Sequence, residues 1–349
     1  MNQQELKLLS VARSVFVASE VLFKRYYVRI AQKMGYLMGM MLVISIISFL
    51  AIKAAPNSFM AAGGLNPNMT PEVIAHLKAV YGLDQTLIRQ YFGWLENILT
   101  FDFGVSFVTG KEVIQEIKDR MGITLFINIT TMIIVFSLAI WLGIKAALHQ
   151  GSRIDRFVKQ LSLFSFSMPT FYLALLLILL FSVVLEIFPI SGTHSIGIEG
   201  EGFFIYYADM LWHLILPFMV IIFVSIGSMT MYVRSLTIEI LKSDYINFCK
   251  ARNLEQRKII KLYIFPNLLP PIVTLLGLSL PGLLGGSVIL ETIFSIDGMG
   301  QLFYNSALSR DYPIIMGLLM ITAFLTLLGN MIADLILLKL NPFFKRSNA

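Results

Sequence analysis

The sequence predicts an all-α, polytopic membrane protein with six transmembrane helices. Of its 349 residues, 57% are hydrophobic and 14% are charged, a composition well outside that of soluble proteins. Six mostly apolar stretches are long enough to cross a bilayer core, which takes about 20 helical residues. The net charge of +6 comes from basic residues scattered between these stretches. Because nucleic-acid binding requires a continuous basic patch, we expect no nucleic-acid partner.

The expected spans occupy residues 35–52, 123–148, 161–188, 211–233, 272–294 and 314–338. A long polar leader precedes the first span, and no small-x-small cleavage site follows it. We therefore interpret this span as a retained anchor and not as a secretory signal. Pro169 and Pro217 predict kinks in the third and fourth spans.

The distribution of lysine and arginine predicts the orientation. These residues concentrate in 1–34, 149–160, 234–271 and 339–349, whereas 189–210 holds none and 294–313 holds only Arg310. Because an excess of basic residues marks short cytoplasmic loops, both termini are predicted to be cytoplasmic.

The chain then divides into four parts. They are a cytoplasmic N-terminal segment (1–34), the first span with an external helical segment (35–118), a core of five spans (119–338) and a cytoplasmic tail (339–349). Residues 1–26 fit either an amphipathic helix on the membrane or a solvated leader. In the external segment, Thr70-Pro71-Glu72 predicts the start of a helix.

The cytoplasmic loop 234–271 predicts a helical hairpin. Two helical stretches, 236–252 and 255–265, flank Asn253, a residue that tolerates the left-handed conformation ending many helices. Its apolar residues gather near the turn: Ile246, Phe248, Ala251 and Leu254. The size of this hairpin and its position below a membrane domain favour its interpretation as a docking element. The alternative is a basic amphipathic hairpin lying on anionic lipid.

The fifth span has an interior with little side-chain volume. Its small or helix-perturbing residues are Ser279, Pro281, Gly282, Gly285, Gly286 and Ser287. Such residues permit either close helix packing or a translocation path. Glu291 follows them, and a carboxylate in a span costs a few kcal/mol, on the order of 3, unless it faces water or a partner. Asp334 in the sixth span has Lys339 as a candidate partner, and we favour a packing role for it.

Several motifs resemble one known family. Asp244-Tyr245, Ala251-Arg252-Asn253-Leu254 and Asn267-Leu268-Leu269-Pro270 resemble the EAA-type coupling signature of type I ABC importer permeases, in the branch that imports peptides or nickel. The resemblance extends from Tyr27 to Pro342. It includes Tyr81-Gly82-Leu83-Asp84, Phe101-Asp102-Phe103-Gly104-Val105-Ser106, Gly151-Ser152-Arg153-Ile154-Asp155, Ser167-Met168-Pro169-Thr170-Phe171, Phe188-Pro189-Ile190-Ser191-Gly192, Gly285-Gly286-Ser287 with Glu291-Thr292, and Arg310-Asp311-Tyr312-Pro313.

The resemblance implies the type I permease fold in a bacterial inner membrane. It also implies a homologous second permease subunit, one or two ATP-binding subunits and an extracytoplasmic solute-binding protein, with membrane lipid around them. The residues expected to couple to the ATPase are Asp244, Tyr245, Phe248, Cys249, Ala251, Arg252, Asn253 and Leu254. Those expected to line the translocation path are Gly285, Gly286, Ser287 and Glu291.

The chain itself carries no phosphate-binding GxxxxGK[ST] motif, and its lone Gly110-Lys111 lies in the external segment. We therefore expect a transport subunit that is not an enzyme, with no cofactor of its own and with ATP bound by its partners. Four residues depart from the family pattern. Asn253 replaces the usual turn glycine, Cys249 replaces an alanine, Asp297 replaces a proline, and Asn341 before Pro342 replaces an aspartate.

Other functions remain as alternatives. Peptide cargo is favoured over nickel, and the four histidines show no helical ligand spacing, so no metal site is expected. A secondary carrier or channel should show intramembrane ion-relay charges or inverted repeats. A membrane-embedded enzyme should show a motif such as HExxH or GxSxG. The sequence contains two isolated intramembrane acids, no repeat and neither motif.

Overall fold

The computed structural model describes residues 30–51, 53–54 and 85–340. Within these ranges the chain is helical, and the strand-like pairing there is a single antiparallel bridge between Val105 and Glu112. Five helices are long and apolar enough to cross a membrane, and a bent helix pair makes a sixth when the pair is counted as one span. The predicted all-α fold with six spans is therefore confirmed. The predictions for residues 1–26 and for Thr70-Pro71-Glu72 lie outside the described residues.

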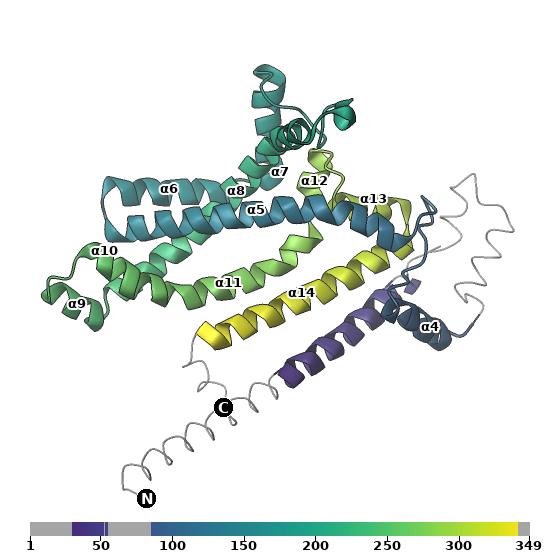
Figure 1. Ribbon diagram of the computed structural model, residues 1–349, viewed down its shortest axis with the longest axis horizontal. Helices are drawn as coiled ribbons and strands as arrows, with labels where there is room; N and C mark the ends of the chain where they lie inside the picture. The colour runs from purple at the N-terminus through teal and green to yellow at the C-terminus, as the bar shows by residue number, and fades with distance from the viewer. Residues whose placement is uncertain (1–29, 52, 55–84, 341–349) are drawn as a thin grey trace, which may run out of the picture.

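Two long helices form the centre of the molecule (Figure 1). They are α5 (Val113–Leu148) and α8 (Phe203–Leu241), the second and fourth spans. Their backbones approach closely at Gly143, where a Cβ atom would lie 2.8 Å from the Cβ of Val233. The helix α8 continues through Pro217 without a break. Small residues at a helix contact allow this close approach, which explains the glycine in an otherwise bulky span.

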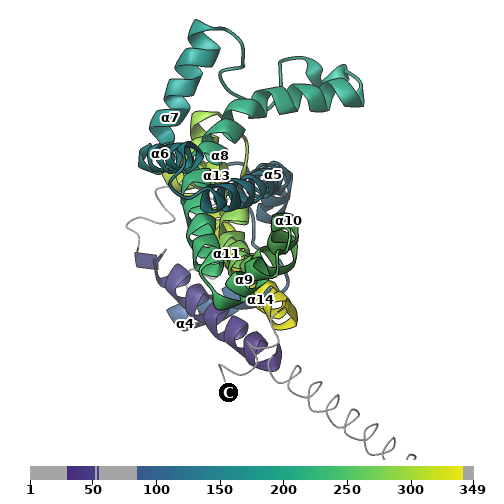
Figure 2. The ribbon, with the colours of Figure 1, turned by 90° about the vertical axis from the view of Figure 1, so that its left-hand side faces the viewer.

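The predicted third span, 161–188, is wrong as one straight helix. The helix α6 (Arg153–Ser167) is followed by α7 (Thr170–Leu177) and a π-helical turn (Ile178–Val184), at an angle of 98° (Figure 2). Met168, at the break, has an extended backbone with ψ of 121°. Pro169 explains this, because its ring disfavours a helical conformation in the residue before it. The kink predicted at Pro169 is confirmed and is larger than an ordinary kink.

The fifth span also differs from its predicted range of 272–294. It begins earlier, as a continuous helix built from α10 (Gln256–Ile259), a π turn (Ile260–Ile264) and α11 (Phe265–Gly285). It ends at Gly286, which has φ of 65° and ψ of 172°, a conformation that only glycine adopts without strain. The short α12 (Val288–Ile293) follows. Gly286 and Ser287 therefore form a break and not a helix interior.

The remaining elements of the described residues are the first span (Ile30–Ala51), α4 (Leu87–Leu99), a 3-10 turn (Ile198–Gly200), α13 (Met299–Ser309) and α14 (Tyr312–Leu340). The sixth span, in α14, packs on α11, where Gly277 lies directly against Ala333. In the sixth span Asp334 pairs with Lys33 of the first span. This partner comes from the other end of the chain, and the sequence did not indicate it.

Candidate functional site

The hairpin at one end of the molecule begins where α8 stops. The predicted helix 236–252 is wrong as a single element, because α8 ends at Leu241 and α9 covers Asp244–Ala251. Ser243 lies between them with an extended backbone, ψ of 148°, and its hydroxyl donates to the carbonyl of Ile240. A serine that bonds a nearby carbonyl competes with helix propagation at that point. A break in the helix at Ser243 therefore separates the hairpin from the fourth span, and the two are not one rigid helix.

The turn of the hairpin is formed as the sequence predicts. Asn253 has φ of 54°, in the left-handed region. The amide of Leu254 donates to the carbonyl of Cys249 at 3.2 Å, and the amide of Asn253 donates to Lys250 at 2.9 Å. These two bonds define a Schellman motif, with Leu254 packed in the same cluster as Cys249. The asparagine thus performs the role of the usual glycine.

The helix α9 has one buried face and one exposed face. Ile246 and Cys249 are buried in a cluster with side chains of α5, α8 and α11, including Val135, Val233 and Leu268. On the other side Phe248 is 63% exposed, and Asp244 and Ala251 are exposed beside it. The apolar residues predicted to gather at the turn therefore divide between the two faces.

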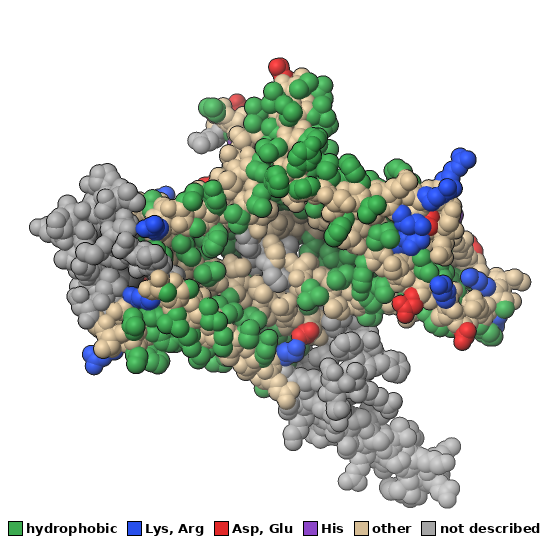
Figure 3. Space-filling model, turned by 180° about the vertical axis from the view of Figure 1, so that it is seen from behind, with side chains coloured by type: hydrophobic (Ala, Val, Ile, Leu, Met, Phe, Trp, Pro, Cys, Tyr) green, Lys and Arg blue, Asp and Glu red, His purple; other side chains and the backbone are tan. Residues whose placement is uncertain are grey.

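The exposed face combines aromatic and charged groups. Tyr245 is 44% exposed, and the Arg252 guanidinium lies 5.7 Å from the centroid of the Phe248 ring. Figure 3 shows charged side chains gathered at the end of the molecule that holds α9 and α10, which the sequence predicts to be cytoplasmic. An exposed aromatic side chain held by an arginine is a favoured contact for a protein partner. We name Asp244, Tyr245, Phe248, Ala251 and Arg252 the coupling face.

A buried ion pair fixes the membrane helices above the hairpin. Arg234, in the last turns of α8, donates to both carboxylate oxygens of Asp155 at 2.6 and 3.0 Å. Asp155 is fully buried and also accepts from the amide of Gly151 at 2.9 Å. The exposed Lys159 adds a contact at 3.2 Å. A carboxylate with this many donors is well satisfied, so the pair ties α6 to α8 firmly.

Sequence reasoning found only one member of this pair. Asp155 belongs to the motif Gly151-Ser152-Arg153-Ile154-Asp155, but Arg234 was counted among the basic residues of a cytoplasmic loop. A charge within two turns of an apolar span could have marked Arg234 as a residue that needs a partner. Which acid it meets depends on the fold.

At the other end of α11, Glu291 is enclosed by the chain itself. It is 4% exposed, accepts from Thr124 Oγ1 at 3.1 Å and accepts from the amide of Gln301 at 3.0 Å. Gly286, Gly298 and Gly300 surround the carboxylate so closely that none has room for a side chain. Glu291 therefore joins α12 and α13 to α5. Ser287 caps α12 by accepting from Leu290 N at 3.4 Å. That these residues line a translocation path stays a prediction.

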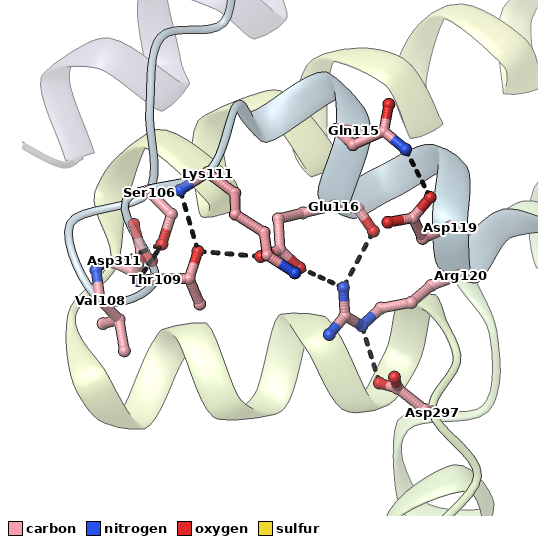
Figure 4. A network of polar contacts seen from close by, with 10 residues as sticks. All are labelled: Ser106, Val108, Thr109, Lys111, Gln115, Glu116, Asp119, Arg120, Asp297 and Asp311. Carbon is pink, nitrogen blue, oxygen red and sulfur yellow. Dashed lines mark hydrogen bonds and ion pairs between the residues drawn. The ribbon is translucent and has the colours of Figure 1, made fainter.

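A polar network lies beside this region (Figure 4). Arg120 of α5 donates to Asp297 at 2.7 Å and also pairs with Glu116, which accepts from Thr109 Oγ1 at 2.8 Å. Asp297, which departs from the family pattern, thus has a partner on α5. The buried Asp311 accepts from Ser106 and from the amide of Phe107. Burial raises the pKa of Asp311, and these hydrogen bonds oppose the shift.

Comparisons with known proteins agree with this architecture. The family model described as "Binding-protein-dependent transport system inner membrane component" matches residues 139–346, and the model for the N-terminal part of such components matches residues 25–128. A solved structure of the MetNI methionine ABC transporter, in an inward-facing conformation, matches with a TM-score of 0.50 and 15% identity. It covers 65% of this chain and 97% of that chain, and shows the fold alone.

Several sequence relatives have a higher sequence identity to this chain than that solved structure has. The oligopeptide transport system permease protein AppB of Bacillus subtilis is 34% identical over 86% of this chain and 94% of its own. The di/tripeptide transport system permease protein DppB of Pseudomonas aeruginosa is 30% identical over 90% and 97%. The metal-staphylopine import system permease protein CntB of Staphylococcus aureus is 31% identical over 90% and 96%. The chain therefore belongs to the inner-membrane components of binding-protein-dependent transport systems, as a type I ABC importer permease of the peptide and nickel branch.

Proposed function

We propose that this chain forms half of the translocation path of a bacterial importer for dipeptides and oligopeptides. A homologous second permease supplies the other half, one or two ATP-binding subunits dock on the coupling face, and an extracytoplasmic solute-binding protein delivers the cargo. Both termini face the cytoplasm. The ATP-binding subunits hold the nucleotide, because the chain has no GxxxxGK[ST] motif.

The coupling face is the observation that carries this proposal. The hairpin directs Ile246 and Cys249 into the core of its own chain, and it leaves Phe248 and Ala251 outside beside Asp244 and Arg252. A hairpin lying on lipid would turn its apolar side toward the membrane and its charges toward water. Here one narrow face mixes an acid, an arginine and two aromatic rings, which suits a protein groove.

The geometry also provides a route for motion. The second arm of the hairpin is one continuous helix from Gln256 to Ser279, so a shift of α9 moves the fifth span directly. The buried cluster around Ile246 carries the same shift to α5 and α8, and the Asp155–Arg234 pair carries it to α6. The joint at Ser243 allows α9 to tilt relative to α8. Packed helices move as rigid bodies, so a nucleotide-driven shift at the hairpin reorients the spans.

Peptide cargo is supported by relatives named for oligopeptide and di/tripeptide transport. The metal-staphylopine relative supports a second candidate, a metal chelate. Uptake of a radiolabelled tripeptide and of a nickel chelate, in cells with and without this gene, separates the two. We expect the peptide to depend on the gene, and dependence of the chelate alone would replace the peptide assignment.

Purification of the tagged chain from cells with active transport tests the assembly. We expect a second multi-spanning protein and ATP-binding subunits to copurify. A transport-competent complex whose only permease is this chain would contradict the pairing with a second, different permease.

A further inference from the structure

The helix α4 is fixed against the first span, the helix Ile30–Ala51 (Figure 1). The Tyr91 hydroxyl lies 2.8 Å from Ser45 Oγ, and the Phe49 ring centroid lies 5.5 Å from that of Tyr91 and 5.8 Å from that of Trp94. Ser45 and Phe49 are both buried. These contacts place α4 level with the last two turns of the span.

The residues at that level are those expected at a membrane–water boundary. Ile47 and Leu50, in the same two turns, are large apolar side chains left exposed by the chain, as expected of residues in contact with hydrocarbon. Lys53 is the first charged residue after the span, and its Nζ lies 5.6 Å above the Phe49 ring. Lysine, tyrosine and tryptophan are the residues that mark this boundary in membrane proteins. The Phe49 ring thus contacts three interfacial side chains: Lys53, Tyr91 and Trp94.

A second apolar face of α4 has no cover within the described chain. Ile88, Phe92 and Leu99 are 70%, 61% and 74% exposed, and the half-buried Leu95 lies between them in sequence. Their spacing puts all four on one stripe of the helix. At about 100° per residue, this stripe lies about a quarter turn from the face that carries Tyr91 and Trp94.

The polar residues of α4 lie on the remaining side. Arg89, Glu96 and Asn97 are exposed and are centred roughly 110° from the apolar stripe, at about 100° per residue. The helix has three distinct sides, one against the first span, one apolar and one polar. An amphipathic helix at a membrane boundary places its apolar side among the acyl chains and its polar side in water.

We propose that α4 is an interfacial helix that lies on the lipid surface at the Ala51 end of the first span, with Ile88, Phe92, Leu95 and Leu99 inserted between acyl chains. The occupant of the stripe is phospholipid, because α4 is held at the depth where its neighbours Ile47 and Leu50 meet hydrocarbon. This anchoring is independent of cargo and of ATP coupling.

Photocrosslinking in native membranes tests the proposal directly. A benzophenone amino acid is incorporated in place of Phe92 in the full complex, the membranes are irradiated, and the mass of the purified chain is measured. We expect an increase equal to one phospholipid. The same amino acid in place of Ile47 serves as the lipid-facing standard, and in place of Glu96 it serves as the water-facing control, which should gain no phospholipid.

A protein adduct at position 92, with the second permease or the solute-binding protein, would overturn the lipid assignment. A lipid adduct at position 47 with none at position 92 would overturn it as well. Both readouts are masses of this chain, so they stand whether or not the proposed importer function is correct.

Discussion

The hairpin of α9 and α10 and the loop around Gly286 lie at opposite ends of the fifth span. The two regions differ in whether their side chains find partners within the chain. Around Gly286, the Glu291 carboxylate and its glycine neighbours find their partners within the chain. On the hairpin, Phe248 and its polar neighbours point outward. The first region depends on backbone geometry and the second on surface side chains. Under the proposed function, motifs of the same family mark an internal brace in one region and a docking surface in the other.

The largest effect is expected from Gly286→Leu. A Cβ at this position would collide with the Glu291 carboxylate and lie 2.9 Å from the amide of Gly300, and its φ of 65° disfavours any side chain. We expect a loss of stability of about 3 kcal/mol or more. Size-exclusion chromatography of a fluorescent fusion should show little folded complex. A role in lining a translocation path would instead predict that the substitution blocks uptake and leaves assembly intact.

Gly282→Leu is the matched control. It lies in the same span, but a Cβ there would meet no atom within 4 Å in this chain. We expect normal amounts of folded complex. Equal behaviour of the two variants would contradict the distinction between a tightly enclosed glycine and an open one.

The next effect is expected from Asp155→Ala, which leaves the Arg234 guanidinium buried without its carboxylate. Removing one member of a buried pair costs about 3–5 kcal/mol. The thermal unfolding temperature of the purified complex should fall sharply. Lys159→Ala removes only the exposed partner of the same carboxylate and should change it little. Similar shifts for the two variants would mean that Asp155–Arg234 is not the important contact.

These residues also show what sequence could and could not predict. Hydropathy correctly located the six apolar stretches, because burial in lipid constrains composition along about 20 consecutive residues. Asn253 was predicted as the turn because the left-handed conformation is a local property of the residue. The break at Met168 was predicted only as a kink at Pro169, and the break at Gly286 was missed, since hydropathy counts apolar residues and does not report helix continuity.

Contacts between residues far apart in the sequence were harder to predict. Asp155 and Arg234 are separated by 79 residues, and only the packing of α6 on α8 brings them together. For Asp334, a local search suggested Lys339, whereas the partner is Lys33, 301 residues away. The sequence indicated a partner for Asp334 but not for Asp155 or Arg234, and the identity of each partner is a property of the tertiary fold.

The smallest effect is expected from Asp297→Asn, near the Gly286 loop. The Asp297 side chain is 69% exposed, so its pair with Arg120 is well screened by solvent. We expect a change in stability of about 0–1 kcal/mol, decreasing further at high salt. Thermal unfolding at low and high ionic strength measures it. A large, salt-independent loss would mean that the polar network braces this end more strongly than its exposure indicates.

If the coupling face binds the ATP-binding subunits, Ala251→Asp should disrupt that contact. Ala251 is exposed in this chain, so the new carboxylate does not disturb the hairpin's own core. In a partner's groove it would be a buried, unpaired charge that costs about 3 kcal/mol, or more than about a hundredfold in affinity. Gln150→Asp adds the same charge to the exposed α5–α6 loop and serves as the control.

The measurement is the amount of ATP-binding subunit that copurifies with the tagged permease, together with peptide uptake in cells. We predict that Ala251→Asp inserts normally, loses the ATP-binding subunits and abolishes uptake, while Gln150→Asp retains the subunits and uptake. Full retention of the ATP-binding subunits and normal uptake by Ala251→Asp would contradict the assignment of the coupling face.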